Sequence, residues 1–507
     1  MQRISSVADT ASTATIYVLG LLTVVMLNGC ASIAPRLSEG EVASYSTYLG
    51  QRLASAVQPL DGKLTVGDAV ARAVRYNATI RAKELEAALA EAHVRSRSGE
   101  MLPNLVAETR YYQRDRAHSS RSSQSTVYST SSDLSTLSSD ITLSWNILDF
   151  GLSFIRAKQG LDKAHQQHED VRRVSARIGE ETRSLYWKAV ASAKLGPAAA
   201  GLAAELDEAV RLSRAAAADP ALDPLVAIDY QRDILALRRD LSSLQTSLAG
   251  TTAQLNQSIG MPLSGKLTLE SSERLPKRAL PASTVAEDVS TALRQRPEIR
   301  QHMYDMRITE NEVDAVFLRL LPGATLSGTA ASDSTSFLLH SDWIEASTRI
   351  AGNLMNLVRL PAELDTLDAQ QSVHRQNALA SAATIMMQVH VARARIEVQM
   401  RAFRDAERFA DVQRQLYRQV RAAVQAGKVG RQALVREKLA TLLTQVRMLV
   451  AFADLDSAFA AYATARGDDP VPLQSAGAGR GAMSFAAQIG ARVQQPIPAQ
   501  ASAAALP

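Results

Sequence analysis

The sequence has few of the residues that build small compact cores and active sites. Only 5% of its 507 residues are aromatic, and Cys30 is the single cysteine, so no intramolecular disulfide can form. It contains no glycine-rich phosphate-binding loop, no Gly-x-Ser-x-Gly turn and no cysteine–histidine pair. His165 and His168 share a helical segment, but no third ligand lies near them in the sequence. We therefore expect no enzymatic activity, no cofactor and no bound metal.

Charge of one sign is also scarce. The formal net charge is +5, and positive and negative residues alternate along the helical stretches. This pattern is typical of solvated helix faces, so we expect no nucleic-acid partner.

Long apolar runs are absent beyond the N-terminus. Residues 16–27 are mostly apolar, but they are fewer than the roughly 20 residues that a membrane-spanning helix needs, and they fit a secretory signal. The following Leu27-Asn28-Gly29-Cys30 resembles the bacterial lipoprotein signal, which implies a signal peptide over 1–29 and a lipid attached to Cys30. Ala31 after the cysteine resembles an outer-membrane address. An ordinary signal peptide with a chance cysteine, or a start codon placed too early, remains an alternative.

No run of 18 or more apolar residues is apparent after Cys30. If the mature chain crosses a membrane, we expect it to do so by strands.

The sequence contains an internal repeat. An Arg-Tyr-Asn motif ending at Asn77 precedes a helical stretch and Pro103, and a Gln-Arg-Pro motif ending at Pro297 precedes a similar stretch and Pro322. The offsets are 297 − 77 = 220 and 322 − 103 = 219. A nearly constant offset over two landmarks indicates a duplicated structural unit.

Each half is predicted to contain a short helix, a strand pair, a long helix, a turn and a second short helix. The first repeat spans 64–260, with strands within 104–148 and a long helix over 151–218. The second spans 283–466, with weaker strands within 324–356 and a long helix over 360–426. A polar leader over 30–63, a linker over 261–282 and a disordered tail over 467–507 complete the chain.

Within this outline, one helix is expected from Thr65 to Leu102 and one from 225 to 259, and Pro197 should kink or break the first long helix. The Ser/Thr-rich residues 115–139 are expected to form a polar loop.

The clearest strand lies over 141–147. Ile141, Leu143, Trp145 and Ile147 alternate with polar residues. Such alternation is typical of a lipid-facing barrel strand and equally of any half-buried sheet. Trp145 and Trp343 are either bilayer-interface anchors or core residues.

The long helices each measure on the order of 100 Å at 1.5 Å per residue, so they must pack along one another or along other subunits. Four strands per chain leave two open edges, which lipid does not tolerate, so a barrel needs more chains. Three chains would supply twelve strands, an even number in the usual range.

The ordered set of motifs resembles the TolC-like outer-membrane efflux factors over nearly all of 64–466. The motifs are Leu64-Thr65 with Asp68-Ala69-Val70 and Asn77, then Leu102-Pro103, then Leu143 to Gly151, and the second copy around Pro297 and Pro322. The resemblance implies a mainly α fold with a β-barrel part. A homotrimer would form a twelve-stranded outer-membrane β-barrel and a long periplasmic α-helical barrel, meeting an inner-membrane transporter through a periplasmic adaptor.

The resemblance also implies adaptor-docking turns at the periplasmic helix tips. The second-half turn contains Gly427, Val429 and Gly430. The first-half turn contains Asp223, Pro224 and Leu225, without the usual glycine. Asp229 matches an acidic residue at the pore entrance, and Arg436 holds the equivalent place in the second half. A mixed Asp/Arg entrance would allow interhelical ion pairs that hold the tip closed, whereas the alternative is that both charges are simply solvated.

We expect a passive exit duct in the outer membrane for efflux or type I secretion. The rival interpretation is a coiled-coil periplasmic lipoprotein that links partners without a pore.

Overall fold

The computed structural model describes residues 37–55, 60, 62–116, 119–120, 123, 127, 129–130, 133–217, 224–263, 265–270 and 275–470. The predicted signal peptide, Cys30, Asp223 and most of the predicted tail lie outside these residues. The chain divides into two units, Met1–Pro59 and Leu60–Pro507. The described part of the first unit is a helix, α2 (Glu39–Ser55), within the stretch expected to be a polar leader.

The second unit contains the duplicated architecture. The elements of its first half are α3 (Val66–Tyr76), α4 (Ala78–Gly99), β1 (Asn104–Gln113), β4 (Ser135–Asn146), α5 (Ile147–Ala217), α6 (Pro224–Leu248) and α7 (Thr251–Ser258). Those of its second half are α8 (Val285–Gln295), α9 (Pro297–Leu318), β5 (Gly323–Asp333), β6 (Asp342–Ala351), α10 (Met355–Gln425) and α11 (Arg431–Arg466). Corresponding elements start at one offset: 285 − 66, 297 − 78 and 323 − 104 all equal 219. The two long helices, α5 and α10, have 71 residues each.

The predicted first helix of each half is in fact two helices. Asn77 ends α3 in an extended conformation, and its side chain accepts a hydrogen bond from the Thr79 amide at the start of α4 (2.9 Å). Arg296 is extended in the same way, and Pro297 begins α9. Asparagine caps helices well and proline suits their first turn, so different residues produce the same break in both halves.

Two further helix predictions need correction. The helix expected over 225–259 is interrupted at Gly250, whose positive φ of 77° separates α6 from α7. By contrast, a kink or a break was expected at Pro197, and the structure excludes the break, because α5 continues through this residue to Ala217. Its long packed neighbours hold the helix on both sides of the proline, which outweighs the lost backbone hydrogen bond.

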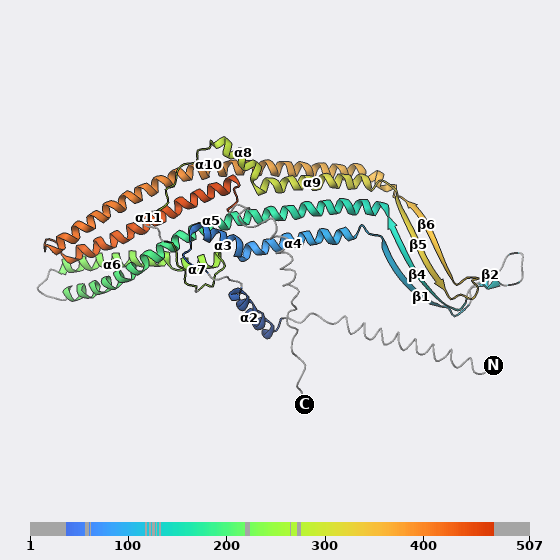
Figure 1. The fold of residues 1–507 in the computed structure, drawn as a ribbon, viewed down its shortest axis with the longest axis horizontal. Coiled ribbons are helices and arrows are strands. Elements are labelled where there is room, and N and C mark those ends of the chain that lie inside the picture. The colour runs from blue at the N-terminus through green and yellow to red at the C-terminus, as the bar shows by residue number, and fades with distance from the viewer. Residues whose placement is uncertain are drawn as a thin grey trace, which may run out of the picture. The chain divides into compact units, whose positions relative to one another are not determined.

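The four longest strands form one antiparallel sheet in the order β1-β4-β5-β6 (Figure 1). The central pairing of β4 with β5 joins the two repeats, with Leu143 opposite Gly328. The second-half strands were expected to be weak, yet β5 and β6 pair from Gly323–Ala351 to Ser332–Asp342. The expected polar loop is also shorter, because β4 begins at Ser135 and β2 (Ser119–Ser120) pairs with β3 (Ser129–Thr130). The outer edges of β1 and β6 have no strand partner among the described residues.

Helices continue from the sheet as a layer (Figure 1). Next to the strands, α5 packs between α4 and α9, and α10 packs on α9. Farther away, α5 packs against α6 and α11, and α10 packs on α11. The apolar residues of α5, α6 and α11 bury one another along this second stretch, including Leu206, Leu241 and Leu439.

The few aromatic residues of the core gather where α3, α7 and α11 meet α5. The Trp187 and Phe452 rings are 4.7 Å apart and nearly perpendicular, and Phe403 lies 5.3 Å from Phe452. Edge-to-face contacts of this kind stabilise packing beyond the buried area. This cluster joins both repeats at mid-length.

One described helical segment, Ala433–Arg466, is long and apolar enough to cross a bilayer by length and composition. Charged residues such as Arg447 and Asp454 interrupt it, so it is not an unbroken apolar run of the kind expected to be absent after Cys30. Its apolar side chains face other helices: Leu439, Phe452 and Ala453 are fully buried. A core helix passes the same test as a membrane helix, and the packing here accounts for the composition.

Candidate channel wall and helical tips

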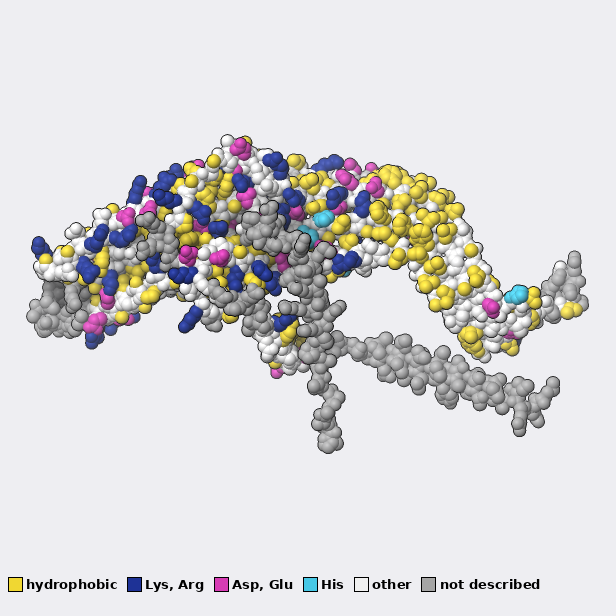
Figure 2. Space-filling model, viewed as in Figure 1, with side chains coloured by type: hydrophobic (Ala, Val, Ile, Leu, Met, Phe, Trp, Pro, Cys, Tyr) yellow, Lys and Arg dark blue, Asp and Glu magenta, His cyan; other side chains and the backbone are white. Residues whose placement is uncertain are grey.

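The four-stranded sheet has one apolar face. The strand register places the following side chains on it: Leu105, Ala107 and Tyr111 of β1, Leu137, Ile141, Leu143 and Trp145 of β4, Leu326 and Ala330 of β5, and Ile344 and Ile350 of β6. All its large members are exposed, from 38% for Trp145 to 86% for Ile344. A soluble sheet buries its apolar face, so this exposure calls for an apolar surrounding outside the chain. Hydrophobic side chains cover this end of the molecule in Figure 2.

The opposite face of the sheet is polar. Its members are Glu108 and Arg110 of β1, Asp140, Thr142, Ser144 and Asn146 of β4, Thr325, Ser327, Thr329 and Asp333 of β5, and Glu345, Ser347 and Arg349 of β6. Hydroxyl groups bridge neighbouring strands: Thr142 and Thr329 lie 2.9 Å apart, and Ser327 and Ser347 lie 2.7 Å apart. Such a face suits water, so the two faces of the sheet suit different surroundings, one apolar and one aqueous.

The two tryptophans, expected to be either bilayer-interface anchors or core residues, lie on different faces of the sheet. Trp145 stands on the apolar face, where its ring contacts Phe150 at 5.7 Å and its indole N–H donates to the Met101 carbonyl. Trp343 pairs in register with Ala331, on the face that carries the charged residues. Only Trp145 therefore has the position of an interface anchor.

The second-half tip is a tight helix-ending turn. Gly427 has a φ of 71°, and the Lys428 amide donates to the Ala423 carbonyl (2.9 Å) while the Gly427 amide donates to Val424 (3.1 Å). This pair of bonds is the Schellman arrangement, which favours glycine because its φ is positive. Val429 is 40% exposed, and Gly430 caps α11 with an ordinary φ of −72°.

The first-half tip is described only from Pro224, the first residue of α6. Proline suits this position because its fixed φ matches the helix and the first turn needs no amide hydrogen. Leu225 follows and is 77% exposed.

The structure does not bring the two expected entrance residues together. Asp229 pairs with Arg232 of its own helix, at 2.6 Å. Arg436 of α11 instead forms an ion pair with Asp233 of α6, one turn farther on. An ion pair between the repeats therefore exists near the tip, but its acid is Asp233.

Sequence reasoning missed two buried carboxylates, Asp456 within α11 and Asp288 in the first turn of α8. Asp456 is fully buried, with Arg183, Arg278 and the indole N–H of Trp187 around it. Asp288 is 1% exposed and accepts hydrogen bonds from three side chains, which are Ser283 (2.7 Å), Tyr462 (2.7 Å) and Arg393 (2.7 Å). An acidic residue in a helical sequence pattern normally indicates a solvent-exposed position, so nothing in the neighbouring sequence marked these two aspartates as buried.

Burial and hydrogen bonding shift the pKa values of Asp288 and Tyr186. Burial alone would raise the pKa of Asp288, but hydrogen bonds from Tyr462, Ser283 and Arg393 hold that pKa below its ordinary 3.8. Burial raises the pKa of Tyr186 to about 12. The Tyr186 hydroxyl donates to the Leu64 carbonyl (2.9 Å), beside the backbone bridge between Leu64 and Leu269. Both groups act as fixed structural contacts near neutral pH.

His165 and His168, the two histidines singled out in the sequence, each contact another side chain. His168 lies 2.8 Å from Glu91, and His165 stacks on Tyr304. In the part of the chain that the structure describes, no group of three or more potential ligands converges.

Comparisons of the fold give a consistent result. The structure is similar to the CmeC outer-membrane channel of Campylobacter jejuni (TM-score 0.65, 13% identity, 86% of this chain and 96% of that chain). It is also similar to the open state of the MtrE outer-membrane channel of Neisseria gonorrhoeae (0.61, 15% identity, 80% and 89%) and to CusC, studied for transmembrane channel formation (0.60, 17% identity, 82% and 96%). Searches with protein-family models and among curated proteins find no match. The exposed apolar sheet face, the duplicated long helices and these likenesses together show that the chain has the fold of the TolC-like outer-membrane channels.

Proposed function

We propose that three copies of this chain form a passive exit duct across the bacterial outer membrane. The observation that carries the proposal is the exposed apolar face on a sheet whose two edges are unpaired among the described residues. Pairing β6 of one copy with β1 of the next removes both edges, and three copies of four strands give a closed barrel of twelve. The polar face would then line a water-filled lumen.

The helices support the same assembly. The outermost helices of the layer, α4 and α10, carry exposed apolar residues along their length, among them Leu85 and Leu89 of α4 and Met387, Val391 and Val398 of α10. Burying these side chains against a neighbouring copy would stabilise the trimer by about 25 cal/mol for each Å² of apolar surface removed from water. The helices would continue the lumen into the periplasm as a tunnel.

The proposed partners would bind at the helical tips. We propose that the helical tips, with Asp223, Pro224, Leu225, Gly427, Val429 and Gly430, dock a periplasmic adaptor that connects the duct to an inner-membrane transporter. Asp229 and Arg436 would lie at the pore entrance. A lipid on Cys30 would anchor the chain to the outer membrane after removal of 1–29. Cys30→Ala should abolish incorporation of labelled palmitate, whereas incorporation that persists in this variant would exclude Cys30 as the site.

Chemical cross-linking tests the assembly. The full-length protein in detergent, treated with a lysine-reactive cross-linker, should give a ladder that ends at three chains. A cysteine at Thr109 of β1 and another at Ala346 of β6 should join different chains through a flexible bis-maleimide in a Cys30→Ser background. A control pair at Ala107 and Ile141, which are opposite each other within one chain, should give only intramolecular links. A protein that stays monomeric, or a trimer without β1–β6 links, would favour the linking lipoprotein without a pore.

A further inference from the structure

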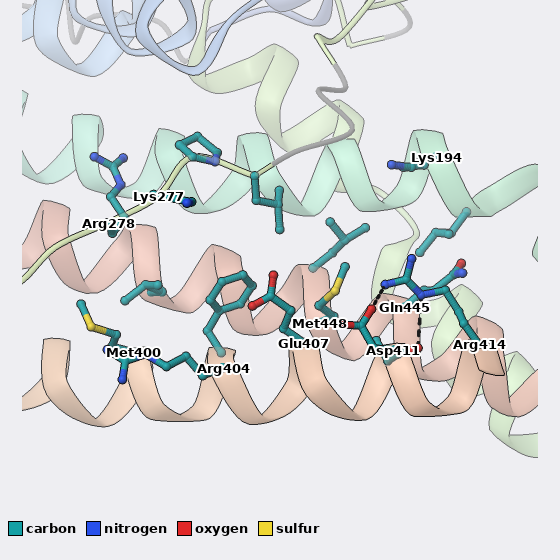
Figure 3. A pocket seen from close by; sticks show the side chains of 17 residues that line it. Lys194, Lys277, Arg278, Met400, Arg404, Glu407, Asp411, Arg414, Gln445 and Met448 are labelled. Atoms are coloured by element: carbon teal, nitrogen blue, oxygen red, sulfur yellow. Dashed lines mark hydrogen bonds and ion pairs between the residues drawn. The ribbon is translucent and has the colours of Figure 1, made fainter. Parts of the chain in front are cut away.

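A cavity of about 580 Å³ lies beside the mid-length core. It is walled by α5, α10, α11 and the segment Leu275–Arg278 of the linker between the repeats (Figure 3). Small-molecule sites in proteins have about 300–1,000 Å³ and combine an apolar lining with a few polar groups. The volume of this cavity is therefore suitable for a small ligand.

The floor of the cavity is apolar. Leu195, Met400, Leu449 and Leu455 are buried there, and Met448 adds a flexible side chain. Methionines adapt to irregular apolar ligands because their unbranched side chains have three rotatable bonds. An alkyl chain or an aromatic ring could bind against this floor.

The rim of the cavity carries unneutralised positive charge. Lys194, Lys277 and Arg404 line it, and none makes a hydrogen bond or ion pair with any residue that the structure describes. By contrast, Arg414 pairs with Asp411, and Arg278 pairs with buried Asp456.

The only acid on this rim without a described partner is Glu407, which in Figure 3 rises from α10 into the cavity. The rim therefore has three free cations against one free carboxylate. This excess favours an anionic ligand head group.

We propose that this cavity binds an anionic amphiphile, with its apolar body on the methionine- and leucine-lined floor and its carboxylate or similar head between Lys194, Lys277 and Arg404. The other available occupant is the end of the chain itself. Residues 471–507 include Arg480 and Arg492 and contain no Asp or Glu. These positive side chains are repelled by the positive charge of the rim. Charge complementarity therefore selects the small anionic molecule. The site does not depend on the proposed duct.

Photo-labelling of the full-length protein in lipid nanodiscs tests the site. The probe is a diazirine-bearing dodecanoate, and labelled peptides are identified by mass spectrometry. We expect label on the α10 peptide around Met400 and the α11 peptide around Met448, displaced by dodecanoate but not by dodecanol. The triple variant K194Q/K277Q/R404Q should raise the half-saturating probe concentration about tenfold, since three exposed charge contacts each contribute modestly.

A matched variant controls for net charge. R401Q/R418Q/K428Q removes three exposed cations that do not line the cavity, and it should label like the natural protein. Equal displacement by dodecanol, unchanged labelling of the triple variant, or label confined to the apolar face of the sheet would overturn the proposal. Cavity label that appears only after removal of 471–507 would also overturn it, because the chain end would then be the occupant.

Discussion

Arg436 of α11 pairs with Asp233 of α6, so the second repeat is tied to the first near the helical tips. The two side chains are 58% and 35% exposed, so the pair contributes less than about 1 kcal/mol to folding. Lys438 of α11 forms a similar pair with Glu205 of α5. Both contacts join the halves of the duplicated unit at the place where a tunnel would open.

Breaking the tip pair should change gating rather than stability. Arg436→Ala removes this ion pair between α11 and α6, so we expect a higher open probability or larger single-channel conductance in planar bilayers, with thermal stability little changed. Arg211→Ala is the matched control, because Arg211 pairs with Glu208 inside α5 alone. Identical conductance of Arg436→Ala and the natural protein would rule out a role for this pair in holding the tip closed.

Adjacent residues of β4 should respond oppositely to a charge. Leu143 lies on the apolar face and Ser144 on the polar face. Leu143→Arg should reduce the amount of trimer in outer-membrane fractions, since arginine on the lipid face costs from about 1 kcal/mol near the interface, where Trp145 lies, to about 2–4 kcal/mol at mid-bilayer. Ser144→Arg should assemble normally and alter the conductance instead. Equal assembly of both variants would contradict the assignment of faces.

The buried Asp456 should be a major contributor to stability. Asp456→Asn removes the charge that Arg183 and Arg278 both face, and removing one partner of a buried pair costs about 3–5 kcal/mol. Denaturant unfolding followed by tryptophan fluorescence would measure this loss, because Trp187 donates to the same carboxylate (3.1 Å). Asp454→Asn, two residues away in the sequence and not in contact with Arg183, Arg278 or Trp187, serves as the control. A loss below about 1 kcal/mol, the usual limit for an exposed pair, would show that Asp456 is solvated.

Asp288 predicts a specific acid sensitivity. Its pKa is lower in the folded than in the unfolded chain, so its contribution is complete above the ordinary value of 3.8 and is lost as the pH falls through the folded-state pKa. The Asp288→Asn variant lacks the stabilisation from the ionised carboxylate at neutral pH. Its free energy of unfolding should therefore not fall on acidification through the titration of this residue. The free energies of unfolding of the two proteins should therefore converge below pH 3.8, and a gap that stays constant across this range would be inconsistent with the depressed pKa.

The internal repeat could be predicted from the sequence because the residues that mark it determine the backbone conformation at their own positions. Pro103 and Pro322 each end a helical stretch, and proline acts through its own backbone. The break between the two helices at the start of each half is also specified locally, by Asn77 in the first half and Pro297 in the second. Because the two residue types differ, only their equivalent places in the repeat indicate that the break is shared. The alternation over 141–147 likewise indicated a strand with an apolar face.

The remaining features depend on contacts between distant residues. Pro197 stays within α5 because neighbouring helices support both sides of it, which no window of sequence records. Asp233 rather than Asp229 meets Arg436 because the relative rotation of α6 and α11 decides which acid faces the pair. Asp288 and Asp456 looked like solvated charges until Arg393 and Arg278, both distant in sequence, were placed against them.

The most direct test of the proposed duct is conductance of the purified full-length protein in planar lipid bilayers. Cross-linked trimers should insert and give discrete steps of ion current, and Ser144→Arg on the polar face should change the step size. Trimers that insert into the bilayer yet carry no current at any applied voltage, including the Arg436→Ala variant, would contradict the account.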